Sequence, residues 1–227
     1  MSGTGCAPRT PSWTPDSRLF QLPRLRAGSV GIAVTFFGMF ALFYVNAQFL
    51  QYVKGYSPQQ AGGAIVPLAL GMMVFTKCGV RGAECVGEAR TAGAGLALIA
   101  AGLLLLSTTN ALTPYLLYMA FLLVMSAGAG LAMPTLSHAI VASLPAHRSG
   151  MGSGLQGAAR ELGAALGIAV VGTVLSVRLA SSTGHGTAIA TAFTEATALG
   201  YRIAAGVVMV VGTAVVTGLR TRGRVCG

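Results

Sequence analysis

Long uncharged segments are the feature that most constrains this chain. Six stretches are apolar, and four of them reach the ~20 residues that a helix needs to cross ~30 Å of hydrocarbon. Only 9% of the 227 residues are charged, whereas soluble domains carry about 25%. The runs are too long and too uniform for membrane β-strands, which alternate in polarity. The sequence therefore predicts an all-α polytopic membrane protein with spans near 27–50, 62–76, 91–109, 112–136, 152–177 and 203–219.

Two of these segments, 62–76 and 203–219, are short for a span. We expect them to cross by bilayer thinning, by tilt or with help from their polar flanks. The segments divide the chain into three parts. A Pro- and Arg-containing cytoplasmic leader covers 1–26, the six-span transmembrane domain covers 27–220, and a cytoplasmic tail covers 221–227.

The charge balance is strongly basic, with a formal net charge of +10. In a soluble protein this balance would favour nucleic-acid binding. Here eleven of the fifteen basic residues fall on the side of the N-terminus and three on the other side, and Arg160 lies within a span. Positive residues gather in cytoplasmic loops of membrane proteins. We therefore expect a multi-pass protein of the cell membrane with both termini cytoplasmic, and no nucleic-acid partner.

The fifth segment carries both small residues and charges. Ala159, Gly163 and Gly167 recur every four residues, a spacing typical of close helix–helix packing in membranes. Ionisable residues inside spans are usually functional, and Glu161 is the only acidic residue within the predicted spans. Arg160 and Glu161 are thus candidates for a coupling pair. The alternative is a structural pair near the inner membrane boundary, where Arg160 could snorkel.

An aromatic row follows one face of the first segment. It consists of Phe36, Phe40, Phe43 and Tyr44. One interpretation is ordinary core or lipid contact; the other is a cavity wall that stacks flat solutes. On the second interpretation Asn46 and Gln48, toward the outer end, would orient the solute.

The motifs that could indicate an enzyme lack the structural context that their chemistry requires. The run 152–157 matches G-x-G-x-x-G, but it opens a membrane helix and no acid follows ~20 residues on, as dinucleotide binding requires. Ser126 and Ser153 have no histidine within a predicted span, so an intramembrane serine protease is disfavoured. The four cysteines form no metal-binding spacing. We expect no enzyme activity, no metal and no cofactor.

Several motifs together resemble the C-terminal half of a major facilitator superfamily transporter, and more closely the fourteen-span drug:proton antiporters of the EmrB/QacA type. The motifs are SRLF at 17–20, QFLQYVKGYSPQQAG at 48–62, VPLALG at 66–71, GAGLAMP at 128–134, GSG at 152–154 and ARELGAALG at 159–167. The resemblance implies half of a major-facilitator bundle and proton-coupled efflux of lipophilic or cationic solutes.

Two departures from that family shape the expectation. Only about six spans are present, whereas such transporters bind substrate between two halves. The expected short basic loop between the second and third spans is replaced at 77–90 by a run with two acids and two cysteines, as a reading-frame slip or relaxed selection would produce. We therefore expect a truncated half-transporter, active only as a homodimer or with a missing N-terminal half. A non-transporting fragment, or an accessory membrane protein that pairs with another chain, is the alternative.

Overall fold

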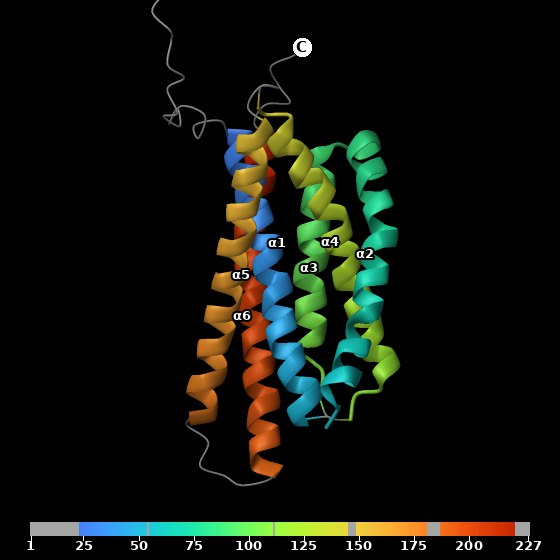
Figure 1. The fold of residues 1–227 in the computed structure, drawn as a ribbon, viewed down its shortest axis with the longest axis vertical. Coiled ribbons are helices and arrows are strands. Elements are labelled where there is room, and N and C mark those ends of the chain that lie inside the picture. The colour runs from blue at the N-terminus through green and yellow to red at the C-terminus, as the bar shows by residue number, and fades with distance from the viewer. Residues whose placement is uncertain (1–22, 54, 111, 145–148, 181–186, 221–227) are drawn as a thin grey trace, which may run out of the picture.

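The computed structural model describes residues 23–220 apart from 54, 111, 145–148 and 181–186. The described residues form helices and connecting turns and contain no β-strand. Six α-helices run alternately up and down along one bundle (Figure 1). They are α1 (Pro23–Gln48), α2 (Pro58–Val86), α3 (Glu88–Leu106), α4 (Tyr115–Val141), α5 (Ser149–Ala180) and α6 (Thr187–Arg220), and a π-helical turn (η2, Phe49–Val53) extends α1.

All six helices are long and apolar enough to cross a membrane. This confirms the predicted all-α class and the number of spans. The bounds differ most for the two segments that looked short, because α2 has 29 residues and α6 has 34. Neither needs a thinned bilayer to reach across ~30 Å. Glu195, placed outside the predicted spans, lies within α6 and within its apolar window Phe193–Leu219. The expectation that Glu161 is the only acid in the spans was therefore wrong.

The connection between α2 and α3 is a single residue. The run 77–90, expected as a loop, is helical except at Gly87. Gly87 has φ +97°, a backbone conformation that glycine adopts readily and other residues rarely do. At the other end of α2, Ser57 and Gln60 form a capping box in which each side chain bonds the other's backbone N–H. The capping box at the start of α2 and Gly87 at its end, rather than hydropathy, set the bounds of this helix.

The helices pack as two groups around α1 and α4 (Figure 1). Helix α1 contacts α5, α6 and α4, and α3 packs on α4 and α6, while α2 covers the far side of α4. Glycines permit the closest approaches: a Cβ on Gly95 would lie 2.8 Å from the carbonyl oxygen of Gly128 on α4. Such small-residue contacts replace the hydrophobic driving force that helices lack inside a bilayer.

The start of α1, the α2–α3 connection and the end of α6 lie at the same end of the bundle, the upper end in Figure 1. We call it the α2–α3 end. Helix α1 begins at Pro23, inside the predicted leader. The rest of that leader, 1–22, and the predicted tail, 221–227, lie outside the described residues.

Candidate functional site

Helix α5 lies with its small residues against α1. Ala159, Gly163 and Gly167 are buried, and a Cβ on either glycine would meet the backbone of α1, at Ala33 for Gly163 and at Phe37 for Gly167. The two backbones are therefore as close as side chains permit, which fixes the rotation of α5 about its axis. Residues on its opposite side, such as Leu162 and Leu166, are exposed.

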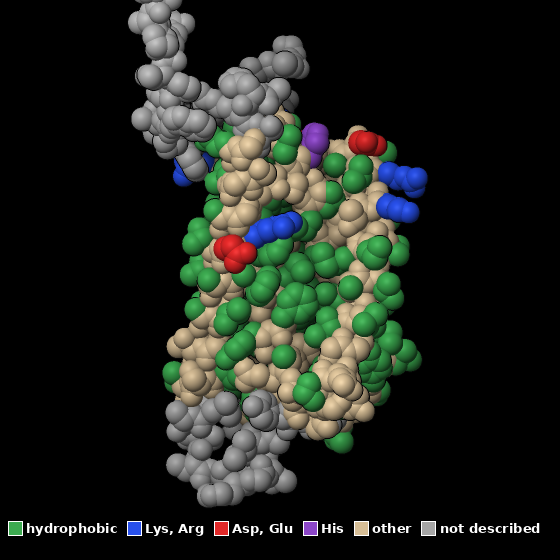
Figure 2. All heavy atoms as spheres, viewed as in Figure 1, with side chains coloured by type: hydrophobic (Ala, Val, Ile, Leu, Met, Phe, Trp, Pro, Cys, Tyr) green, Lys and Arg blue, Asp and Glu red, His purple; other side chains and the backbone are tan. Residues whose placement is uncertain are grey.

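The two charges of this part of α5 are both exposed. The Arg160 guanidinium carbon lies 4.9 Å from the centre of the Phe36 ring on α1, a cation–π contact worth about 0.5–2 kcal/mol. Glu161 is exposed, and within the described residues neither side chain forms an ion pair. Figure 2 shows charged side chains on the visible face of the bundle, surrounded by hydrophobic ones.

The depth of these charges follows from helix geometry. Arg160 lies about 16 Å along α5 at 1.5 Å per residue, and the helix, with 32 residues, is about 48 Å long. If it is centred on ~30 Å of hydrocarbon, Arg160 lies about 7 Å inside the apolar layer, within reach of the surface by snorkelling. A charge held at the membrane centre would cost about 3 kcal/mol; from its shallower depth the Arg160 guanidinium can avoid that cost by reaching the polar surface.

The aromatic row of α1 is continuous and half-buried. Phe36 stacks on Phe40 with ring centres 6.2 Å apart, and Phe40 meets Phe43 edge-on at 5.8 Å. Tyr44 continues the row beside α5, where a Cβ on Gly172 would lie 3.4 Å from the Tyr44 hydroxyl. The structure thus brings the predicted aromatic residues together with Arg160 on one surface, which we call the α1–α5 face.

Asn46 lies apart from this face. Its side chain is fully buried, and its Oδ1 accepts a hydrogen bond from the Tyr118 hydroxyl of α4. The Asn46 Nδ2 is buried with no hydrogen-bond partner among the described residues, a state that costs about 1–3 kcal/mol. Gln48 is half-buried and is the last residue of α1 before the π-helical turn. The predicted amide pair is therefore split, with Asn46 in the core between α1 and α4.

The best-connected charged group was missed by the sequence interpretation. Glu88, in the first turn of α3, pairs with Arg24 of α1, and its other oxygen lies 2.8 Å from Nδ1 of His138 on α4. We call these three residues the Glu88 cluster. An acid directly after Gly87 was a usable signal, because acids favour helix N-termini. The partners, 64 and 50 positions away, carried no local signal. Among the described residues, no three metal-ligating side chains come together.

Comparison with known proteins identifies the family. Residues 7–168 match the Major Facilitator Superfamily. The chain is 28% identical to the multidrug resistance protein Stp of Mycobacterium tuberculosis H37Rv over 74% of its own length and 31% of that relative. It is 28% identical to the multidrug efflux pump LfrA of Mycolicibacterium smegmatis (71% and 32%) and 31% identical to the puromycin resistance protein pur8 of Streptomyces alboniger (80% and 37%). The chain spans about a third of the length of these relatives. The family predicted from the motifs is thereby confirmed: this chain belongs to the Major Facilitator Superfamily.

Proposed function

We propose that the chain is one half of a transmembrane exporter of lipophilic or cationic solutes. The observation that carries this proposal is the α1–α5 face, an aromatic row beside Arg160 in an otherwise apolar surface; neither Arg160 nor the adjoining Glu161 forms an ion pair within the described residues. Aromatic rings bind flat lipophilic solutes, and a few polar groups in an apolar site orient them. The similarity to a multidrug efflux pump and to resistance proteins supports the same substrate class.

The proposal assigns separate roles to the residues of this face. Phe36, Phe40 and Tyr44 form the wall against which the solute stacks, and Gln48 lies at the outer end of that wall. Glu161 carries the exchangeable proton, because a carboxylate can be neutral or charged during a transport cycle. Arg160 stays charged in either state, so it holds the inner end of the site and a partner charge.

The second half of the transporter is part of the proposal. A single six-helix bundle lacks the opposing wall of a midplane site, and Leu162, Leu166 and the two charges of α5 are exposed. A separately encoded N-terminal half or a second copy of this chain would cover them. Without either one, the chain is a non-transporting fragment.

We also propose that the α2–α3 end of the bundle faces the cytoplasm of a plasma membrane, because eleven basic residues belong to the sequence segments that the predicted topology assigns to that side. Reporter fusions after Arg26, within 80–90 and after Arg220 should then report cytoplasm. Fusions near Gly55 and Gly184 should report the outside. A reporter at Arg220 on the outside would contradict the proposed orientation.

The transport proposal is tested most directly by asking whether this chain exports a solute alone or only with a second half. The chain is expressed in a drug-sensitive bacterium alone, and together with the N-terminal half of a related exporter, and ethidium efflux is measured. Efflux is expected only with the second half, and Phe40→Ala should reduce it severalfold, whereas Leu123→Ala, an exposed residue of α4, should not. Efflux by a demonstrably monomeric chain would contradict the half-transporter proposal, and no efflux with any second half would overturn the transport function.

A further inference from the structure

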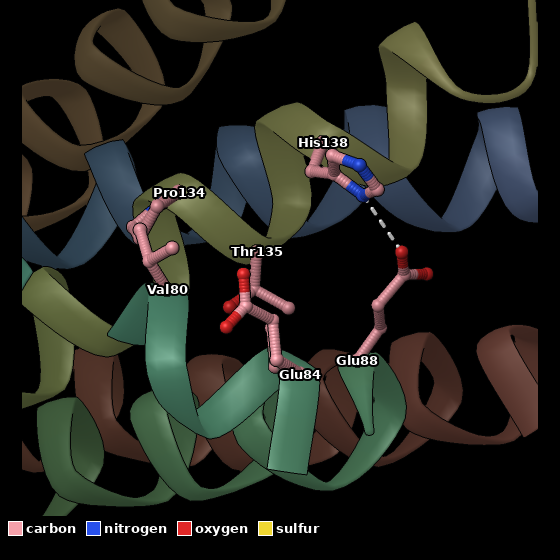
Figure 3. Close-up of a pocket in the computed structure, with 7 residues that line it drawn as sticks. Val80, Glu84, Glu88, Pro134, Thr135 and His138 are labelled. Carbon is pink, nitrogen blue, oxygen red and sulfur yellow. Dashed lines mark hydrogen bonds and ion pairs between the residues drawn. The ribbon is translucent and has the colours of Figure 1, made fainter. Parts of the chain in front are cut away.

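A cavity of about 360 Å³ lies at the α2–α3 end of the bundle, between the last turns of α2, the start of α3 and the end of α4. Its volume falls within the range of about 300–1,000 Å³ that is usual for small-molecule sites. The lining residues are Val80, Ala83, Glu84, Glu88, Pro134, Thr135 and His138 (Figure 3).

The apolar wall of this cavity comes from two helices. Val80 and Ala83 lie on one turn of α2, and Pro134 of α4 lies beside Val80 (Figure 3). The hydroxyl group of Thr135 donates its hydrogen to the Leu131 carbonyl oxygen at 2.8 Å, so it is not available as a donor to a ligand. The wall therefore suits a hydrocarbon group.

The two carboxylates of the cavity differ in their partners. Both oxygens of Glu88 are engaged within the Glu88 cluster, one by Arg24 and the other by His138. Glu84 is exposed and forms no ion pair within the described residues, and Figure 3 shows its carboxylate pointing toward Thr135 across the cavity. Arg81, one turn earlier on α2, is also exposed, and no ion pair joins it to Glu84 in the described part of the chain.

The charge balance of the cavity follows from these contacts. The Glu88 charge is offset by the Arg24 guanidinium. The Glu84 carboxylate forms no ion pair within the described residues, and His138, the basic residue of the cavity lining, is engaged by Glu88. A cavity with an apolar wall and one carboxylate without an ion-pair partner in its lining favours a ligand that combines a hydrocarbon group with one positive charge. An anion would meet the Glu84 carboxylate without a free basic partner in the lining.

We propose that this cavity binds a small amphipathic organic cation, with its hydrocarbon group on Val80, Ala83 and Pro134 and its charged head at Glu84. The site is formed by α2, α3 and α4, whereas the α1–α5 face lies on other helices. Binding here needs no second half and no transport. This inference therefore goes beyond the transport proposal and stands or falls separately from it.

The test measures binding of benzyltrimethylammonium to the full chain in nanodiscs by equilibrium dialysis, with empty nanodiscs as the background. Neopentylbenzene, which has the same shape without the charge, is the matched neutral probe. We expect saturable binding of the cation, and about tenfold weaker binding by Glu84→Gln. Ala83→Leu, which fills the cavity, should abolish binding.

Matched variants control for the two changes. Glu195→Gln removes an exposed carboxylate of α6, and Ala69→Leu enlarges an exposed residue of α2 outside the cavity; both should bind the cation as the unchanged chain does. Equal affinity of Glu84→Gln and the unchanged chain would overturn the proposal, as would equal binding of the neutral probe. Should Ala83→Leu fail to fold, the comparison of Glu84→Gln with Glu195→Gln decides the outcome alone. Equal weakening by these two variants would mean general surface attraction and would also overturn it.

Discussion

The two carboxylates Glu88 and Glu161 occupy opposite kinds of environment in one bundle. Glu88 joins three helices through Arg24 and His138, and its side chain is 20% exposed. Glu161 lies on the exposed side of α5 with no ion-pair partner among the described residues. Removing one partner from a shielded pair leaves an uncompensated charge, whereas an exposed charge contributes little to stability. The Glu88 cluster is thus suited to holding helices together, and Glu161 is free for a proton or a partner.

The largest expected effect concerns the placement of α5, on which this comparison depends. In Gly163→Leu the side chain would collide with the α1 backbone at Ala33, so the helices must separate and we expect most of the folded protein to be lost. Ile168→Leu, on an exposed position of the same helix, should leave the yield unchanged. Folded yield is measured by size-exclusion chromatography of detergent-solubilised membranes. Equal yields would show that α5 does not pack on α1 by this face, and Arg160 and Glu161 would then not be placed as described.

Glu88→Ala tests the cluster itself. The change leaves the Arg24 guanidinium without its partner, and we expect the free energy of unfolding to fall by about 1–3 kcal/mol. Glu84→Ala, four residues earlier and without an ion pair, should change it by less than about 0.5 kcal/mol. Unfolding is followed by circular dichroism in detergent. Equal effects of the two variants would remove the distinction between paired and unpaired carboxylates.

The sequence predicted the part of this architecture that local patterns encode. Apolar length identified six helices, and the spacing of Gly163 and Gly167 selected the side of α5 that faces α1. Hydropathy ended the second span at Lys77 because a charge lowers the average, whereas the helix continues to Val86, nearly three turns further at ~3.6 residues per turn. The capping pair Ser57 and Gln60 was a local signal that hydropathy does not register.

Long-range pairing was beyond such reasoning. Glu88 meets Arg24 and His138 only because the first turns of α1 and α3 lie beside the last turn of α4, and nothing in the local sequence around each residue encodes that contact. Asn46 is a second example, in which a local pattern gave the wrong neighbours. Its spacing placed it near the aromatic row, but the rotation of α1 turns it toward Tyr118 of α4. Helix periodicity fixes which residues share a face and leaves open what that face meets.

A smaller effect is expected at the contact between Arg160 and Phe36. We expect the double-mutant cycle of Phe36→Leu and Arg160→Gln to give a coupling energy of about 0.5–1 kcal/mol, the range for exposed cation–π contacts. The same cycle with Phe40→Leu, whose ring contacts Phe36 and Phe43 instead, should give a coupling near zero. Unfolding in detergent measures both cycles. Equal couplings would mean that Arg160 interacts with the row as a whole rather than with one ring.

The smallest effect on stability is expected for Glu161→Gln. The amide has nearly the shape of the carboxylate, and no described ion pair is lost, so the free energy of unfolding should change by less than about 0.5 kcal/mol. The same variant should have its effect in transport. With a second half supplied, ethidium efflux should lose its dependence on the pH gradient, because the amide cannot carry a proton, while ethidium binding is retained. Glu195→Gln, the matched change at the exposed acid of α6, separates the effect of a specific carboxylate from the effect of removing any carboxylate from a span. If efflux by Glu161→Gln depends on the pH gradient as before, the proton-coupling residue must lie in the other half. Arg160 and Glu161 would then be a structural pair.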